Sequence, residues 1–255
     1  MRRDRRPFLR DDDEMRRLFF TADAVQSAMR FADPSALVCR YTRKMMAFLL
    51  FVPDPRHILI LGLGGGSLAK YCYRHLPRAR ITAVEIDASV IALRREFAIP
   101  EDDQRFEVVH ADGAEYVDRT RLRPDVVLID AFDAEGVAPS LASPAFHARV
   151  SQCLAPQGLM IMNLAGAHSR VRIHIECARD AFPGATLLVP VEGDENRLLF
   201  GFPATPVLPP MPVLRARAAE LARSLEIEFP RYLRRLALAR QVGGATLFPS
   251  EAVDS

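Results

Sequence analysis

The stretch HILILGLGGGS at residues 57–67 decides the fold, because a short apolar run leads directly into a glycine-rich turn. The run predicts a buried strand, and a helix is expected to begin at Ser67. Glycines allow the backbone to turn sharply and to approach a ligand closely. Open α/β sheets bind their cofactors at the carboxyl ends of strands, so this stretch predicts a cofactor loop.

Short aliphatic runs alternate with longer amphipathic segments as far as residue 202, which is typical of a parallel sheet covered by helices. Strands are expected at residues 57–61, 80–85, 106–110, 126–130, 158–163, 185–189 and 198–202. Helices are expected at residues 67–75, 88–97, 114–119, 144–154 and 170–182. The gap before the last strand is too short for a parallel crossover, so the last two strands should pair as an antiparallel hairpin. We therefore expect an α/β fold with a mostly parallel seven-stranded sheet.

Two flanking segments differ from this core in composition. Residues 1–55 carry a charged leader followed by apolar runs, which predicts a small N-terminal cap domain before a catalytic domain at residues 56–202. Residues 203–255 begin with a proline-rich linker, because prolines so closely spaced cannot continue a helix or a central strand. Two C-terminal amphipathic helices are expected after it, at residues 213–225 and 230–240.

Composition excludes several classes of function. The chain has 255 residues, of which 49% are hydrophobic, so it can bury a full core. Its longest apolar stretch, residues 45–52, falls far short of the roughly 20 residues that cross a bilayer. A formal charge of +2 disfavours nucleic acid as a partner, and scattered cysteines and histidines disfavour a metal site. We expect a cytoplasmic enzyme with no membrane segment.

Acidic residues stand where three of the predicted strands end. Glu85 lies nineteen residues after Gly66, where an acid can accept hydrogen bonds from both ribose hydroxyls of a dinucleotide or of S-adenosylmethionine. Asp112, before Gly113, can either accept a hydrogen bond from an adenine amine or cap the next helix. Asp130 ends the fourth strand beside the glycine loop, where the reactive end of a cofactor should lie, so it is the strongest catalytic candidate.

The order of these motifs resembles the spermidine synthases, the polyamine aminopropyltransferases, over about residues 25–202. The resemblance is carried by the glycine loop, Glu85-Ile86-Asp87, Asp112-Gly113-Ala114, Asp130-x-x-Asp133, Pro144-Ala145-Phe146 and Leu154-Ala155-Pro156-Gln157-Gly158. It implies a Rossmann-like class I methyltransferase fold with a small N-terminal β-domain, a homodimer, and no metal. It also implies transfer of an aminopropyl group from decarboxylated S-adenosylmethionine to putrescine or another small-molecule amine.

The resemblance implies a role for each matching residue. On the donor side it implies contacts to the methionine-derived end, the ribose and the adenine from Gln26, Gly62, Gly64, Gly66, Glu85, Asp112 and Gly113. On the acceptor side it implies Asp130 as the catalytic base and Asp133 as a second acid that holds the amine, with Tyr41 near the same site. Glu192, with Asp194 and Glu195, supplies negative charge that can attract a cationic amine.

The chain departs from the family pattern at three places. Gly65 stands where the family loop carries an Asp that contacts the donor amine. The acid that usually follows the position of Tyr41 is absent, and residues 190–196 replace a Tyr-Pro segment with a downstream Trp in a chain that contains no Trp. These departures predict a remodelled acceptor pocket.

Other functions therefore stay open. A methyltransferase that uses S-adenosylmethionine itself is one alternative, because the missing loop acid leaves room for a donor carboxylate and does not repel it. A non-catalytic nucleoside-binding module is another. An NAD-dependent dehydrogenase is disfavoured, because such an enzyme has a stricter glycine loop and a well-placed His or Tyr.

Overall fold

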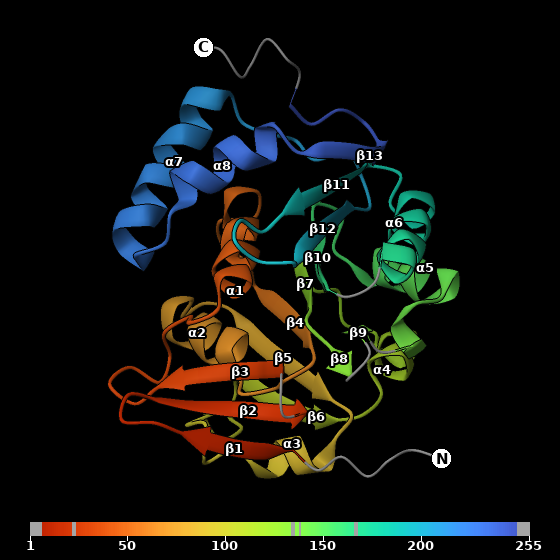
Figure 1. The fold of residues 1–255 in the computed structure, drawn as a ribbon. Helices are drawn as coiled ribbons and strands as arrows, with labels where there is room; N and C mark the ends of the chain where they lie inside the picture. The colour runs from red at the N-terminus through yellow and green to blue at the C-terminus, as the bar shows by residue number, and fades with distance from the viewer. Residues whose placement is uncertain (1–6, 22–23, 134–135, 138, 166–167, 249–255) are drawn as a thin grey trace.

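The computed structural model describes residues 7–21, 24–133, 136–137, 139–165 and 168–248. Its centre is an eight-stranded sheet in the order β13-β11-β12-β10-β7-β4-β5-β6 (Figure 1). The strands are β4 (His57–Leu61), β5 (Arg80–Glu85), β6 (Phe106–His110), β7 (Val126–Ile129), β10 (Leu159–Leu164), β11 (Ala185–Pro190), β12 (Arg197–Phe202) and β13 (Arg240–Gly244). The five strands from β10 to β6 run parallel, and β11 and β12 form the expected antiparallel hairpin.

The sheet has one strand more than the seven expected, because β13 pairs antiparallel with β11. This corrects the helix expected at residues 230–240, since α8 (Phe229–Ala237) ends three residues before β13. The sequence around β13 gives little strand signal, because two of its five residues are glycines. The strand forms because it covers the hydrogen-bonding edge that β11 would otherwise leave open.

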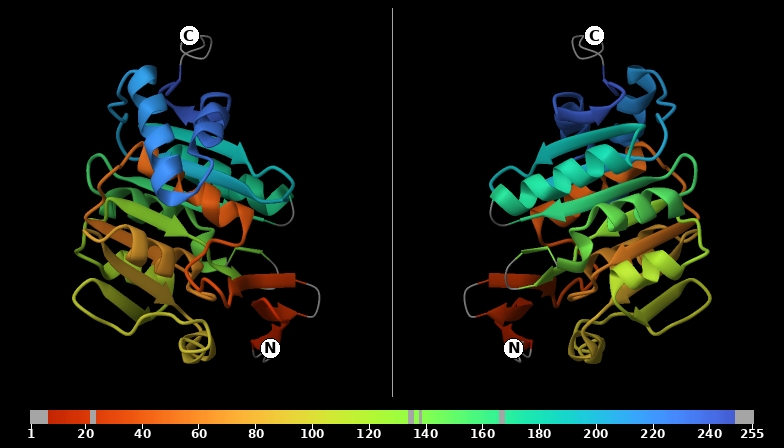
Figure 2. Two further views of the ribbon diagram at one scale, coloured as in Figure 1. Left: turned by 90° about the vertical axis from the view of Figure 1, so that its left-hand side faces the viewer. Right: turned by 90° about the vertical axis from the view of Figure 1, so that its right-hand side faces the viewer.

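Helices cover both faces of the sheet, because successive side chains of a strand point to opposite faces (Figure 2). One face carries Ile58, Ile60 and Leu128 and packs on α1 (Arg40–Met45), the 3-10 helix η1 (Met46–Leu50), α2 (Ser67–His75), α7 (Met211–Leu225) and α8. The other face carries Leu59, Leu61 and Ile129 and packs on α4 (Gly113–Arg119), α5 (Pro144–Cys153) and α6 (His168–Ala181). The helix expected at residues 88–97 is shorter, since α3 (Ala88–Ala92) ends in a series of turns.

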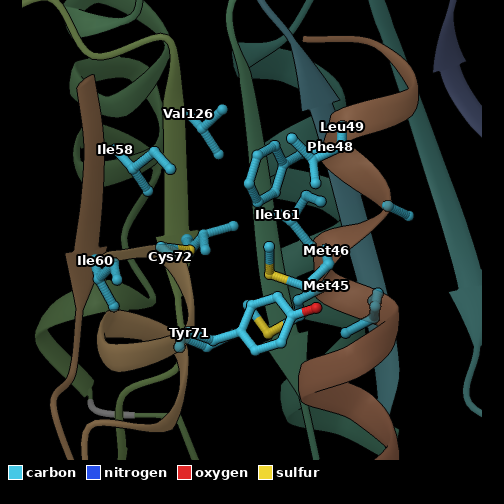
Figure 3. Packing of buried hydrophobic residues seen from close by; sticks show 14 of the residues in the cluster. Met45, Met46, Phe48, Leu49, Ile58, Ile60, Tyr71, Cys72, Val126 and Ile161 are labelled. Carbon is cyan, nitrogen blue, oxygen red and sulfur yellow. The ribbon is translucent and has the colours of Figure 1, made fainter. Parts of the chain in front are cut away.

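The N-terminal segment is divided between two places. Its first part is a three-stranded antiparallel sheet of β1 (Phe8–Asp11), β2 (Met15–Thr21) and β3 (Ala24–Arg30), which lies beside the carboxyl ends of the central strands (Figure 1). Its second part, α1 and η1, inserts Met45, Met46 and Phe48 into the core with no exposed surface (Figure 3). Residues 40–50 thus contribute to the main core rather than to the small sheet.

The C-terminal helices pack into the same core. Leu214 and Phe229 belong to the hydrophobic cluster that contains η1 and one face of the sheet. Two hydrogen bonds join the layers: Tyr71 Oη on α2 donates to the carbonyl of Leu225 at 2.8 Å, and Arg217 Nη1 donates to the carbonyl of Leu50 at 2.7 Å. Among the residues that the structure describes, no helix combines the length and the apolar character needed to cross a membrane.

Both lysines of the chain, Lys44 and Lys70, are buried, with 5% and 3% of their surface exposed. Lys44 Nζ donates a hydrogen bond to the carbonyl of Pro190, and Lys70 Nζ donates one to the carbonyl of Phe97, both at 2.6 Å. Desolvation lowers the pKa of each ammonium to about 8, because burial disfavours the charged form.

Candidate active site

A cavity of about 640 Å³ opens at the carboxyl ends of β4, β5 and β7, between the central sheet and β3. Its wall includes the glycine loop, residues of α1 and residues of the β11–β12 connection. Four carboxylates line it: Glu85, Asp112, Asp130 and Asp194. Three of these four residues, Glu85, Asp112 and Asp130, are the acids that the sequence placed where predicted strands end.

The glycine loop approaches the backbone of β7 closely. Gly62 has a φ of +96°, and a Cβ atom on it would collide with the carbonyl oxygen of Asp130. Gly62 and Gly64 line the cavity, whereas Gly66 stands at the start of α2 with a φ of +68°. The loop thus needs glycine at residue 62 for reasons of space as well as of backbone conformation.

Glu85 fixes the glycine loop from the neighbouring strand. Its Oε2 accepts a hydrogen bond from the Leu63 N–H, and its Oε1 accepts one from the Asp87 N–H, both at 2.9 Å. Each carboxylate oxygen keeps a second lone pair, so the same side chain can still accept bonds from hydroxyl groups in the cavity.

Asp112 both caps a helix and lines the cavity. Its Oδ1 accepts hydrogen bonds from the N–H groups of Ala114 at 2.7 Å and Glu115 at 3.3 Å, so it is the N-cap of α4. Gly113 follows in the cavity wall. Asp112 therefore has the capping role that the sequence left open, and capping α4 holds its carboxylate at the cavity wall.

Asp130 lies directly after β7 and is held on both sides. Tyr41 Oη donates a hydrogen bond to Oδ2 at 3.1 Å, and Asn163 Nδ2 donates one to Oδ1 at 3.0 Å. Desolvation raises the pKa of this carboxyl above its usual value, although the hydrogen bonds from Asn163 and Tyr41 act in the opposite direction. A desolvated carboxylate with a raised pKa is suited to accept a proton.

The hydrogen-bond network continues beyond Asp130 to the end of the sheet. Asn196 Nδ2 donates to Asn163 Oδ1 at 2.8 Å, so the β11–β12 connection is coupled to the carboxylate through two amides. The sequence analysis did not identify Asn163 or Asn196 as site residues. A usable signal existed for Asn163, since a polar residue near the carboxyl end of an otherwise apolar strand is a candidate for the same reason as Asp130.

Gln26 reaches the cavity from the small sheet. The pairing of β2 with β3 shifts here, since Leu18 faces Ser27 while Phe19 faces Val25. Gln26 is therefore the extra residue of a β-bulge, and bulges redirect side chains. Gln26, Ser27 and Tyr41 all line the cavity; Gln26 and Tyr41 were predicted as site residues, and Ser27 was not.

Of the predicted acceptor residues, Asp133 has a side chain outside the described structure, and Glu192 lies away from the cavity. Asp133 ends the two-residue strand β8 (Phe132–Asp133), which pairs with β9 (Gly136–Val137), but its side chain lies outside the described part of the chain. Glu192 does not line the cavity. Its carboxylate pairs with Arg231 and Arg235 of α8 instead, which corrects the prediction of contact with the amine. Asp194, two residues further on, lines the cavity instead.

The space beside Gly65 is closed. A Cβ atom on this residue would lie 2.6 Å from Ser27 Oγ and 2.8 Å from the Phe97 ring. Ser27 Oγ is also 3.3 Å from Ser67 Oγ, so two hydroxyl groups occupy this corner. No group of three or more His, Cys, Asp or Glu side chains suited to a metal ion occurs among the residues described.

The fold and the cavity define a class: a Rossmann-like α/β protein of the class I methyltransferase type, with its site at the carboxyl ends of the strands. The Spermine/spermidine synthase domain model matches residues 38–177. The chain therefore belongs to the spermidine synthase family, and it is a transferase.

The chain is similar to curated proteins of two kinds. The chain is similar to a polyamine aminopropyltransferase of Chromobacterium violaceum, with 36% identity over 91% of this chain and 89% of the relative. It is also similar to the eEF1A lysine and N-terminal methyltransferase of Bos taurus, with 30% identity over 66% of this chain and 27% of that protein.

Among solved structures, a probable spermidine synthase from Corynebacterium glutamicum superposes with a TM-score of 0.69 and 21% identity, covering 86% of this chain and 82% of that one. Human methyltransferase-like protein 13, solved in complex with SAH, superposes with a TM-score of 0.65 and 26% identity. The superposition covers 74% of this chain and 93% of that one.

Proposed function

We propose that the protein transfers an aminopropyl group from decarboxylated S-adenosylmethionine to a small amine, with Asp130 as the base. The observation that carries the proposal is the desolvated Asp130 carboxylate, held by Tyr41 and Asn163 at the wall of a cavity beside the glycine loop. Family membership and the polyamine aminopropyltransferase relatives support the same reaction.

The donor has a consistent set of partners in the cavity wall. The free lone pairs of Glu85 suit the ribose hydroxyls, and Asp112 with Gly113 suits the adenine edge. Gly62 and Gly64 leave room for the methionine-derived chain, and Gln26 offers an amide from the opposite wall. This arrangement directs the sulfonium toward Asp130.

The chemistry requires positioning and one proton acceptor. The amine nitrogen attacks the carbon that joins the aminopropyl group to sulfur, the carbon–sulfur bond breaks, and sulfur retains the electron pair in 5'-methylthioadenosine. An alkylamine has a pKa near that of lysine, about 10.4, so it arrives as an ammonium ion and must lose a proton before it attacks. Asp130 accepts that proton and also attracts the cation. Alignment of the two reactants supplies the remaining acceleration.

Methyl transfer from S-adenosylmethionine is the second candidate, and Gly65 is the observation that favours it. No acid stands at residue 65 to bind a donor amine, and Ser27 and Phe97 fill the space into which such a side chain would begin. A corner without an acidic side chain tolerates a donor carboxylate better than a corner that carries one. The similarity to methyltransferase-like protein 13 points in the same direction.

A product assay by mass spectrometry separates the candidates. The purified protein is incubated with either donor and a panel of mono-, di- and polyamines. Release of 5'-methylthioadenosine with an amine heavier by one aminopropyl unit supports our proposal. S-adenosylhomocysteine with a methylated acceptor supports the second candidate. If every donor and amine pair is unchanged, both are contradicted and the nucleoside-binding module is favoured.

A further inference from the structure

A second cavity, of about 320 Å³, lies between α1, α8 and the β11–β12 loop at residues 191–196. Among the described residues of its wall, Arg40 also lines the active-site cavity, and the others do not. The second cavity therefore lies behind the loop, apart from the acids at the carboxyl ends of the strands.

Positive charge exceeds negative charge in the wall of the second cavity. Five basic side chains and two acidic ones line it: Arg40, Arg43, Lys44, Arg231 and Arg235 against Glu192 and Glu228. The excess acts on Lys44, since burial lowers the pKa of this ammonium to about 8 and the charges of Arg235 and Arg231 lower it further. An anion in this cavity would relieve the repulsion among these groups.

The Glu192 side chain shows how the cavity holds an anionic group. Its carboxylate pairs with both Arg231 and Arg235, which stand one helical turn apart on α8. Guanidinium groups bind carboxylates and phosphates through the same forked pair of N–H donors. The carboxylate of the loop thus occupies a place that an external oxyanion can also take.

The arginines of α1 surround this pair on the other side of the cavity. Arg43 is firmly held, because its Nε and Nη2 donate to the carbonyls of residues 37 and 38 at 2.8 and 3.0 Å. Arg40 is held less firmly, because its Nη1 donates to the carbonyls of residues 192 and 193 at 3.3 and 3.4 Å. An entering anion would meet fixed charge from Arg43 and adaptable charge from Arg40.

We propose that the second cavity binds a small phosphate-type oxyanion on Arg231 and Arg235, in competition with the Glu192 carboxylate. A dianion compensates the excess positive charge better than the single charge of Glu192 does. The volume lies at the low end of the roughly 300 to 1,000 Å³ of small-molecule sites, so it suits a phosphate or diphosphate group. Occupation by the anion and docking of Glu192 exclude each other.

Isothermal titration calorimetry of the full chain with orthophosphate, diphosphate and acetate, at constant ionic strength, tests the site. Both phosphates are expected to bind, and acetate should bind about 10-fold more weakly because it carries one charge. Arg231→Gln and Arg235→Gln should each raise the Kd for diphosphate about 10-fold, as expected for hydrogen bonds between charged groups. Arg234→Gln removes the same charge from α8 outside the second cavity and should behave as wild type.

The competition is tested on the loop. Glu192→Gln should lower the Kd for diphosphate about 10-fold, because it removes the internal competitor and leaves both arginines available to the anion. Glu195→Gln is the matched control, since it removes the same charge from the same loop outside the second cavity. Its Kd should stay close to that of the wild type.

Uridine diphosphate distinguishes two sources of the phosphate group, and its base differs from that of the proposed donor. Binding tighter than that of diphosphate assigns the site to a nucleotide, and equal or weaker binding assigns it to a free phosphate. Either result supports the inference if Arg231→Gln and Arg235→Gln weaken binding and Arg234→Gln does not.

Three outcomes overturn the inference. The wild type could fail to bind either phosphate, acetate could bind as tightly as phosphate, or Arg234→Gln could weaken binding as much as Arg231→Gln, which would indicate general surface charge. If the variants of α8 do not fold, the comparison of Glu192→Gln with Glu195→Gln decides. No donor or amine enters these titrations, so a failure of aminopropyl transfer would not contradict this inference.

Discussion

At the scale of single residues, Asp130 experiences opposing influences on its affinity for a proton. Burial raises its pKa, and the two hydrogen bonds that it accepts lower it, with burial as the larger influence. The hydrogen bonds from Tyr41 and Asn163 therefore favour the ionised carboxylate and oppose the effect of burial. This balance leads to two predictions.

Asp130→Asn should abolish most of the transfer while the fold is retained. An asparagine keeps the shape and can still accept from Asn163 and donate to Tyr41, but it cannot take up the proton. We expect a loss in kcat of about 10²- to 10⁴-fold, the usual contribution of a general base. Donor binding by calorimetry should stay near wild type, and Asp118→Asn on the surface of α4 is the control. Full activity in Asp130→Asn would exclude it as the base.

Tyr41→Phe should shift the acid limb of the pH–rate profile to higher pH. The limb arises because Asp130 loses its capacity to accept a proton as the pH falls through its pKa. Removal of the Tyr41 hydrogen bond removes an influence that lowers this pKa, so the carboxyl becomes protonated at a higher pH. The kcat profiles of the two proteins measure the shift. A limb that moves to lower pH contradicts the role given to Tyr41.

Gly65→Ala should destabilise the protein, although the backbone there does not require glycine. The new methyl group meets Ser27 and Phe97 at less than 3 Å, so the loop or the small sheet must move. Overpacking of this kind costs about 1 to 3 kcal/mol of unfolding free energy. Gly113→Ala is the control, because its nearest neighbours lie at 3.6 Å. Equal thermal stability of the two variants would show that the corner is open.

At the scale of elements, the strands of the core were predictable and the details of the site were not. Buried aliphatic runs such as β4 and β7 carry their own signal, and the glycine loop follows directly from one of them. The edge strand β13 depends on a pairing partner far away in the chain, and the bulge at Gln26 depends on the register of two strands.

The acids that follow the predicted strands could be placed from the sequence, whereas the acids of the β11–β12 loop could not. Glu85, Asp112 and Asp130 end parallel strands, so one rule places all of them at one edge. Glu192 and Asp194 occupy a short loop, where neighbouring residues face opposite cavities. The sequence shows that the loop is acidic, but it does not show which carboxylate faces which cavity. In the structure, Arg231 and Arg235 of α8 pair with Glu192.

Tyr71→Phe tests whether the C-terminal helices stabilise the core. The change removes the hydrogen bond from α2 to the carbonyl at the end of α7 without changing the packing. We expect a loss of about 1 kcal/mol in the free energy of unfolding. Tyr73→Phe, whose hydroxyl donates to the exposed carboxylate of Asp103, is the matched control and should cost less. Chemical denaturation measures both, and equal effects would indicate that α7 contributes little.

At the scale of the whole molecule, segments from both ends of the chain meet in one core. Residues 40–50 and the C-terminal helices pack on the same face of the sheet, while the small N-terminal sheet supplies Gln26 and Ser27 to the cavity. The cavity wall therefore combines residues of the central fold with residues of the N-terminal segment.

The burial of Lys44 and Lys70 has a practical consequence for labelling. An enzyme that acts on amines offers no side-chain amine of its own at the surface, so acylating esters should leave both lysines of the folded protein unmodified. Intact-mass measurement after brief treatment should show no side-chain acylation, whereas the denatured chain should gain two acyl groups on its lysines. Acylation of either lysine under native conditions would then report local opening of α1 or α2. The count of acyl groups thus becomes a readout of folding that needs no added probe.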